Sequence, residues 1–115
     1  MQAIAERILC RIEDIPEGEG KGFDIDQPDE IIEVVVVRRG DAVFGYRNDC
    51  PHVGTPLNWV DDRFMTLDRK YILCATHGAE FRVDDGYCIA GPCAGDSLTP
   101  VELELHDGAV VLRGL

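Results

Sequence analysis

The chain has 115 residues, of which 45% are hydrophobic and 29% are charged, the balance of one globular domain. No apolar run approaches the roughly 20 residues that a membrane-spanning helix needs, which excludes a helical membrane protein. The 22 acidic residues outnumber the 11 lysines and arginines, so the net charge of −11 argues against nucleic acid as a partner. This charge favours a partner with a basic face, or it serves only to keep the protein in solution.

The first third of the chain predicts one strand and one loop. Residues 1–7 lack the basic stretch and apolar core of a secretory signal, so we expect a cytoplasmic protein. Ile8, Cys10 and Ile12 recur with a period of two, which predicts a strand that buries these three side chains. The acidic, glycine-rich stretch 17–30 is typical of a surface loop.

Two hairpins are predicted on either side of the middle of the chain. Residues 31–37 are isoleucine and valine apart from Glu33, typical of a well-buried strand, and a turn at Gly40 leads into a second strand at 42–46. Near the C-terminus, residues 101–105 alternate in polarity, and Asp107-Gly108 is a strong hairpin signal. Short strands, tight turns and weak helix signals together predict an all-β fold.

Two cysteine–histidine pairs lie between these hairpins. Five cysteines are an odd number, and disulfides are rare in the cytoplasm, so metal binding explains some of them better. The pairs are Cys50 with His52, and Cys74 with His77. Such spacing lets one tight loop present both side chains to a metal. Cysteine sulfur and histidine nitrogen suit both iron and zinc, so the ligands alone leave the metal open.

The sequence around both pairs resembles the cluster-binding loops of the Rieske [2Fe–2S] family. Residues 48–57 (NDCPHVGTPL) are similar to the first loop, and residues 74–81 (CATHGAEF) are similar to the second. Residues 85–92 (DGYCIAGP) resemble the strand and proline loop that cover the cluster. The resemblance covers residues 48–92 well and the flanking segments loosely.

The resemblance implies one [2Fe–2S] cluster, with Cys50 and Cys74 on one iron and His52 and His77 on the other. Two neutral imidazoles in place of two thiolates raise the charge of the oxidised cluster from minus two to zero. The cluster then accepts an electron more easily, in a window of about −150 to +300 mV.

The implied fold is Rieske-like, an antiparallel β sandwich with an inserted cluster-binding subdomain, all within one domain. We expect the scaffold to comprise residues 1–47 and 93–115, and the insertion to comprise residues 48–92.

The implied function is one-electron transfer from a ferredoxin reductase to a terminal oxygenase or a related redox enzyme. With the four ligands assigned, His106 is the remaining histidine, and no nucleophile–base pair is evident. We therefore expect no catalysis beyond electron transfer. Two alternatives stay open: a structural zinc module with the same ligands, and a Rieske subunit fixed in a larger oxidoreductase. The oligomeric state is also open.

Two departures from the family pattern concern the loops. Residues 53–73 form a longer gap between the ligand pairs than is usual, and we expect Trp59, Phe64 and Met65 to form a small satellite core rather than a docking surface. The loops also lack the extra cysteines and the hydroxyl groups of high-potential members. Fewer hydrogen bonds to the sulfurs predict a potential in the lower part of the family's range.

The third departure is three cysteines without a ligand role. Cys10 is expected to be a buried thiol on its strand. Cys88 and Cys93 are expected to be structural thiols near the cluster, with a disulfide between them as the less favoured alternative.

Overall fold

The computed structural model describes residues 7–49, 57–58, 63–75, 78–91 and 94–114. These residues form nine strands and one turn of 3-10 helix, which confirms the all-β prediction. No helix within these ranges is long and apolar enough to cross a membrane. The elements are β1 (Arg7–Arg11), η1 (Ile12–Asp14), β2 (Gly20–Asp26), β3 (Ile31–Arg39), β4 (Ala42–Arg47), β5 (Tyr71–Leu73), β6 (Glu80–Arg82), β7 (Cys88–Ala90), β8 (Pro100–His106) and β9 (Ala109–Gly114).

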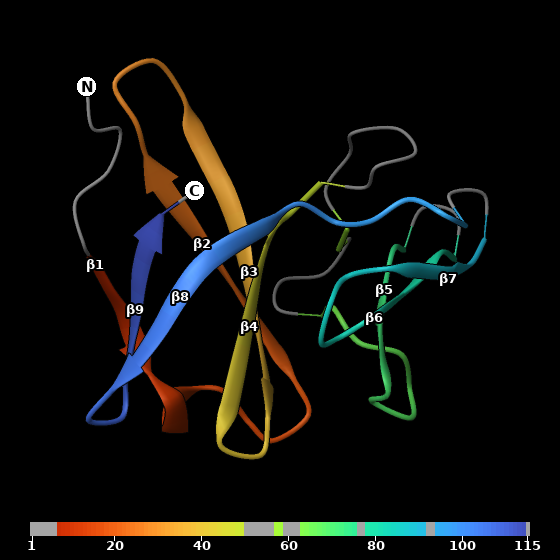
Figure 1. The fold of residues 1–115 in the computed structure, drawn as a ribbon, viewed down its shortest axis with the longest axis horizontal. Coiled ribbons are helices and arrows are strands. Elements are labelled where there is room, and N and C mark those ends of the chain that lie inside the picture. The colour runs from red at the N-terminus through yellow and green to blue at the C-terminus, as the bar shows by residue number, and fades with distance from the viewer. Residues whose placement is uncertain (1–6, 50–56, 59–62, 76–77, 92–93, 115) are drawn as a thin grey trace.

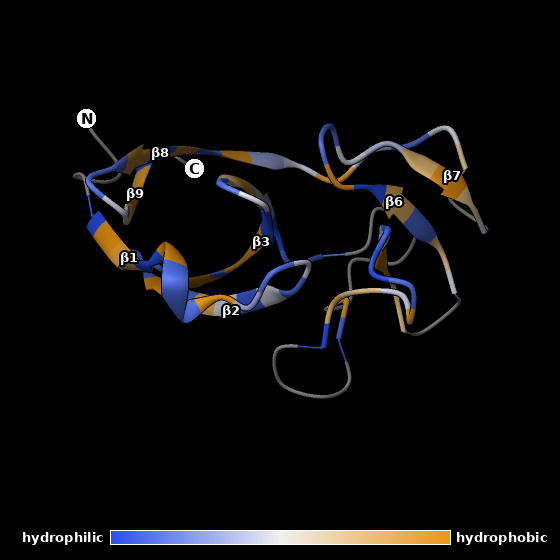
Figure 2. Cartoon of the chain, turned by 90° about the horizontal axis from the view of Figure 1, so that it is seen from below, coloured by the Kyte–Doolittle hydropathy of each residue, from blue (hydrophilic) through white to orange (hydrophobic). Residues whose placement is uncertain are grey.

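The strands form two antiparallel sheets (Figure 1). Six strands follow the order β1-β9-β8-β4-β3-β2, and the order of the smaller sheet is β5-β6-β7. The larger sheet curls, because Leu9 of β1 and Phe23 of β2 pack on the same apolar cluster although their strands lie at opposite edges. In the end-on view its strands surround an interior (Figure 2). The two halves of one curled sheet therefore face each other as the layers of the predicted sandwich.

The four consecutive valines of β3 are explained by the burial of this strand on both of its faces. Val34 and Val36 belong to the clusters inside the curled sheet, whereas Val35 and Val37 belong to the core shared with the smaller sheet. All four side chains are fully buried. A strand covered on both faces needs no polar side chains, so its sequence does not alternate.

Both predicted hairpins are present. β3 pairs with β4 across a turn in which Gly40 has a φ of 62°. β8 pairs with β9 across Asp107-Gly108, whose φ values are 50° and 80°. Positive φ at both central residues fits the twist of an antiparallel pair, which is why Asp-Gly favours this turn.

The prediction of a surface loop at residues 17–30 is wrong, because this stretch contains β2. The strand pairs with β3 in continuous register from Gly20 opposite Val37 to Asp26 opposite Ile31. Four of its seven residues are glycine or aspartate, so its composition is that of a loop. Pairing with the strongly apolar β3 determines its conformation instead.

The predicted burial pattern of β1 is also wrong. Ile8 is 68% exposed, and Ile12 lies in η1 rather than in the strand. A shift in the pairing with β9 between Ile8 and Cys10 is the cause, because an extra residue changes which side chains face inward. Cys10 is half-buried, and this burial raises the pKa of its thiol.

Candidate metal centre

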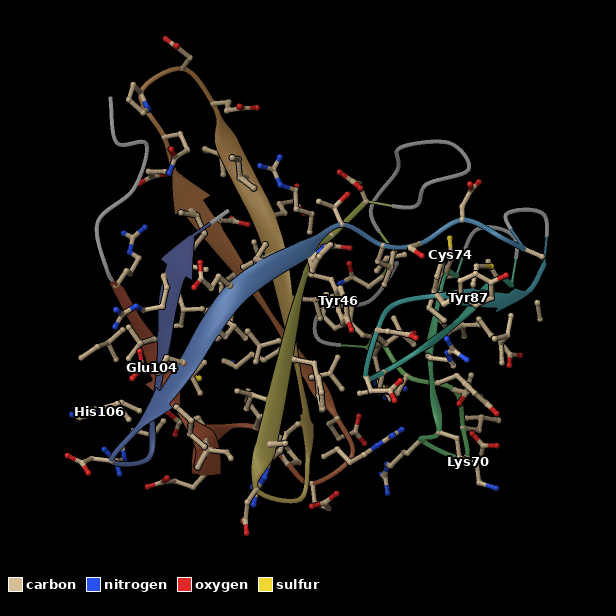
Figure 3. The ribbon with its side chains drawn as sticks, in the orientation of Figure 1. Tyr46, Lys70, Cys74, Tyr87, Glu104 and His106 are labelled. Atoms are coloured by element: carbon tan, nitrogen blue, oxygen red, sulfur yellow. The ribbon has the colours of Figure 1, made fainter. Side chains whose placement is uncertain are left out.

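The smaller sheet packs against β3 and β4 through one apolar core, which includes two of the cysteines. Cys74 and Cys88 lie in this core with at most 1% of their surface exposed. Figure 3 shows Cys74 and Tyr87 in the smaller-sheet region, with Tyr46 on β4 facing that region. The predicted ligand Cys74 is therefore held in an apolar environment.

Tyr46 joins the two sheets by a buried hydrogen bond. Its hydroxyl donates to the carbonyl oxygen of Val83 at 2.6 Å. Burial, with the nearby Asp85 and Asp84 carboxylates, raises the pKa of Tyr46 to about 12. The Tyr46 ring also lies against Gly86, where an added Cβ would approach it to 2.8 Å. This side chain fixes the smaller sheet relative to the larger one.

Cys74 stands at the base of a tight turn directly after β5. Its N–H donates to the Ala79 carbonyl at 2.8 Å, and its own carbonyl accepts from the Gly78 N–H at 2.8 Å. Gly78 has a φ of 74°, a conformation that glycine adopts without strain. His77 lies outside the described residues; in the sequence it falls between Cys74 and Gly78, which these hydrogen bonds join.

The ends of the first motif are tied together by Asn48. The Leu57 N–H donates to Asn48 Oδ1 at 2.7 Å, and Asn48 Nδ2 donates to Asn58 Oδ1 at 3.0 Å. Cys50 and His52 lie between these ends, outside the described residues. Asn48 was not identified from the sequence, although its place two residues before a proposed ligand was a signal.

A backbone hydrogen bond joins the bases of the two loops. The Ala75 N–H, next to Cys74, donates to the Leu57 carbonyl at 2.8 Å. Leu57 closes the segment that contains Cys50 and His52. Segments that carry the two predicted ligand pairs therefore meet, although more than 20 residues separate the pairs in the sequence.

The segment after β7 approaches the second loop. Gly91 has a φ of 96°, and a Cβ there would lie 2.7 Å from Ala79 Cα. Pro92 and Cys93 follow outside the described residues, so neither the expectation that Cys93 is a structural thiol nor the less favoured disulfide with Cys88 is tested. The Cys88 sulfur donates to the Ala90 carbonyl at 3.1 Å, which gives that thiol a structural contact.

The described part of the long gap between the ligand pairs contributes to the core. Phe64 is 1% exposed and belongs to the core of the smaller sheet, with Met65 packed against it. Met65 also pairs with Ile72, and the Leu73 N–H donates to the Phe64 carbonyl. Phe64 and Met65 therefore extend the main core instead of forming a satellite; Trp59 lies outside the described residues.

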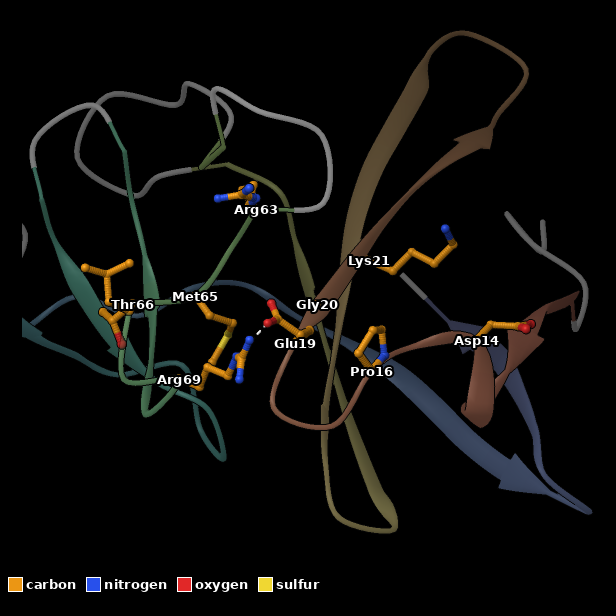
Figure 4. A pocket seen from close by; sticks show the side chains of 10 residues that line it. Asp14, Pro16, Glu19, Gly20, Lys21, Arg63, Met65, Thr66 and Arg69 are labelled. Atoms are coloured by element: carbon orange, nitrogen blue, oxygen red, sulfur yellow. Dashed lines mark hydrogen bonds and ion pairs between the residues drawn. The ribbon is translucent and has the colours of Figure 1, made fainter.

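A groove formed by the described residues lies beside the start of β2. It has a volume of about 620 Å³ and runs between the start of β2 and the segment around Met65 (Figure 4). An ion pair of 2.6 Å between Arg69 and Glu19 crosses it. Cys74 is not among the described residues that line it.

Comparisons with known proteins agree on one family. A model of the Rieske [2Fe–2S] domain matches residues 6–105. The iron–sulfur subunit of the cytochrome b6-f complex of Chlorobaculum thiosulfatiphilum is 30% identical over 89 residues, which are 77% of this chain. The chain spans only 43% of the length of that relative.

Solved structures share the whole fold. The ferredoxin of carbazole 1,9a-dioxygenase from Nocardioides aromaticivorans IC177 superposes with a TM-score of 0.76 at 21% identity, covering 97% of this chain and 100% of that one. A chain in the complex of reduced oxygenase and oxidized ferredoxin of carbazole 1,9a-dioxygenase gives a TM-score of 0.74 at 26% identity, covering 95% and 93%.

Proposed function

Because the chain belongs to the Rieske [2Fe–2S] family and carries its cluster, we propose that Cys50, His52, Cys74 and His77 hold this cluster. Cys50 and Cys74 bind one iron, and His52 and His77 bind the other. The observation that carries this assignment is the hydrogen bond between Ala75 and Leu57, since it joins the loops of both pairs.

The described residues fit such a group. The Cys74 side chain is fully buried beside a closed turn, which suits a thiolate that must be shielded from solvent and oxidation. Two sulfurs and two imidazoles are the donor set of a Rieske centre. The same donors suit zinc, but the family match does not favour the zinc module.

We also propose that the chain divides by role within one domain. Residues 1–47 and 93–115 form the scaffold, and residues 48–92 form the cluster-binding insertion. The pairing of strands supports this division, because β5, β6 and β7 pair with one another and the six remaining strands form the larger sheet.

The protein is an electron carrier. When bound, the cluster supplies one-electron redox chemistry. The apolar core around Cys74 shields this ligand from water. The two neutral imidazoles raise the reduction potential of the cluster. We propose that it catalyses no reaction beyond electron transfer.

The partners we propose are a ferredoxin reductase as electron donor and a terminal oxygenase as electron acceptor. We propose that the protein meets them in the cytoplasm. The similarity to a ferredoxin crystallised with its oxygenase supports the acceptor, and the net charge of −11 suits a partner with a basic face. The cytochrome-complex relative supports the second candidate, a fixed subunit of a larger oxidoreductase. Purification from native cells separates the two, because a fixed subunit elutes with its complex.

Substitution of the histidines tests the ligand assignment. His52→Cys and His77→Cys are each expected to lower the midpoint potential or abolish the cluster, because a thiolate restores negative charge. His106→Cys is the matched control, since His106 is exposed on β8 far from Cys74 (Figure 3). A midpoint that stays unmoved in either ligand variant would remove that histidine from the ligand set.

A further inference from the structure

The residue classed as both polar and buried in the described part of the chain is Asn48, two positions before the proposed ligand Cys50. Asn48 is 8% exposed and follows β4 at the start of the first motif. A buried amide is costly unless its donor and acceptor groups are satisfied. The partners of Asn48 therefore show what this residue does.

Asn48 uses three groups to fix one end of the first loop to its surroundings. Its backbone N–H donates to the Glu33 carbonyl of β3 at 2.8 Å, which anchors it to the scaffold. Its side-chain oxygen accepts from the Leu57 N–H, and its side-chain nitrogen donates to Asn58 Oδ1. The amide thus closes the ten-residue segment 48–57 across its two ends.

This closure continues into the second loop. The Leu57 carbonyl accepts a hydrogen bond from the Ala75 N–H. The Leu57 N–H donates to Asn48 Oδ1. Leu57 is fully buried, so these bonds form away from water, where their geometry is well defined. A connected series of hydrogen bonds runs from β3 through Asn48 and Leu57 to the residue after Cys74.

We propose that Asn48 is a positioning residue for the cluster, whose side-chain amide holds the two ends of the first ligand-bearing loop together and so fixes Leu57, the residue that bonds to the second loop. This inference rests on the proposed ligand set of Cys50, His52, Cys74 and His77. A residue beyond the ligands that orients them controls metal retention and electronic properties, and its loss costs about ten- to a hundredfold in affinity.

The test compares Asn48→Leu with a control of the scaffold core. Leucine has the same branched shape but cannot bond Leu57 or Asn58, so the two ends of the first loop are no longer joined by this side chain. We expect the cluster to be lost to a chelator about ten- to a hundredfold faster, and the EPR lines of the reduced protein to broaden. Val110→Ala, at a buried site on β9, is expected to lower thermal stability while leaving chelator resistance and EPR lines unchanged.

Asn48→Asp provides the conservative variant, and also the measurement if Asn48→Leu does not fold. It keeps the oxygen that accepts from the Leu57 N–H, so its EPR line widths should stay near those of the wild type. Wild-type line widths in Asn48→Leu, or broadening in Asn48→Asp as great as in Asn48→Leu, would overturn the positioning role. Wild-type protein without a Rieske EPR signal would instead overturn the proposed function itself.

Discussion

At the scale of single residues, Tyr46 shows how one side chain joins two parts of the fold. Replacing it with phenylalanine leaves the Val83 carbonyl buried without its donor. We expect Tyr46→Phe to lower the free energy of unfolding by about 1–3 kcal/mol. Chemical denaturation of the loaded protein measures this change. Tyr87→Phe is the control. Tyr87 is 40% exposed, so removing its hydroxyl should change the free energy of unfolding little.

The raised pKa of Tyr46 also predicts how stability depends on pH. The folded protein holds the phenolic proton more tightly than the unfolded chain, whose tyrosine pKa is about 10. This contribution is complete below the unfolded pKa and is lost as the pH rises toward the folded value of about 12. We expect wild-type stability to fall more steeply than that of Tyr46→Phe across this interval. Equal slopes would contradict the assignment.

Gly91 and Gly95 form a matched pair for the loop that follows β7. Both have strongly positive φ values, of 96° and 98°, but only Gly91 lies against another chain segment, since a Cβ added there would come within 2.7 Å of Ala79 Cα. Gly95→Ala should carry backbone strain alone, about 1–2 kcal/mol. Gly91→Ala should cost more than this and also speed cluster loss to a chelator. Similar cluster retention in the two variants would show that the contact with Ala79 is unimportant.

At the scale of elements, β3 separates the two cores. Val35→Ala opens a cavity in the core that contains Cys74, whereas Val36→Ala opens one inside the curled sheet. Each should lower the free energy of unfolding by about 2 kcal/mol, because similar apolar volume is removed. We expect only Val35→Ala to speed cluster loss, measured by bleaching of the visible absorbance. Equal bleaching rates would mean that the two cores are not functionally distinct.

Elements differ in how well the sequence predicts them. The hairpins at Gly40 and Asp107-Gly108 were predictable because their turns have local sequence signals. β2 was not, since its conformation depends on pairing with β3, and the bulge in β1 depends on its register with β9. The β1–β9 pairing joins opposite ends of the chain, and β2 takes its conformation from the neighbouring β3, so neither leaves a local periodicity in the sequence.

The same distinction applies to the candidate site. The four proposed ligands follow from the sequence because cysteine and histidine are rare and the spacing within each pair is local. The contacts that bring the loops together do not, because Asn48, Leu57 and Ala75 are ordinary residues whose roles arise from bonds across the fold.

At the scale of the whole molecule, the net charge of −11 predicts how the protein meets its partners. Electron transfer to a small basic haem protein should slow as ionic strength rises, because salt screens the attraction between opposite charges. Stopped-flow mixing at several salt concentrations measures this rate, and a neutral small-molecule oxidant is the control. An electron-transfer rate that does not change with ionic strength would indicate that the acidic surface serves solubility alone.

The reduction potential is a second property of the whole molecule. We expect a midpoint in the lower part of the range of about −150 to +300 mV, because the loops lack the hydroxyl groups that stabilise the reduced cluster. A spectroscopic redox titration measures it. A midpoint near the upper limit would mean that other groups compensate for the missing hydrogen bonds.

The central claim is that two sulfurs and two imidazoles from separate loops hold a pair of iron atoms. Metal and sulfide analysis combined with EPR of the dithionite-reduced protein tests it most directly. We predict red-brown protein with two irons and acid-labile sulfide per chain, and a mean g value well below that of all-cysteine clusters. Colourless protein with one zinc per chain, or a mean g value typical of four cysteine ligands, would contradict it.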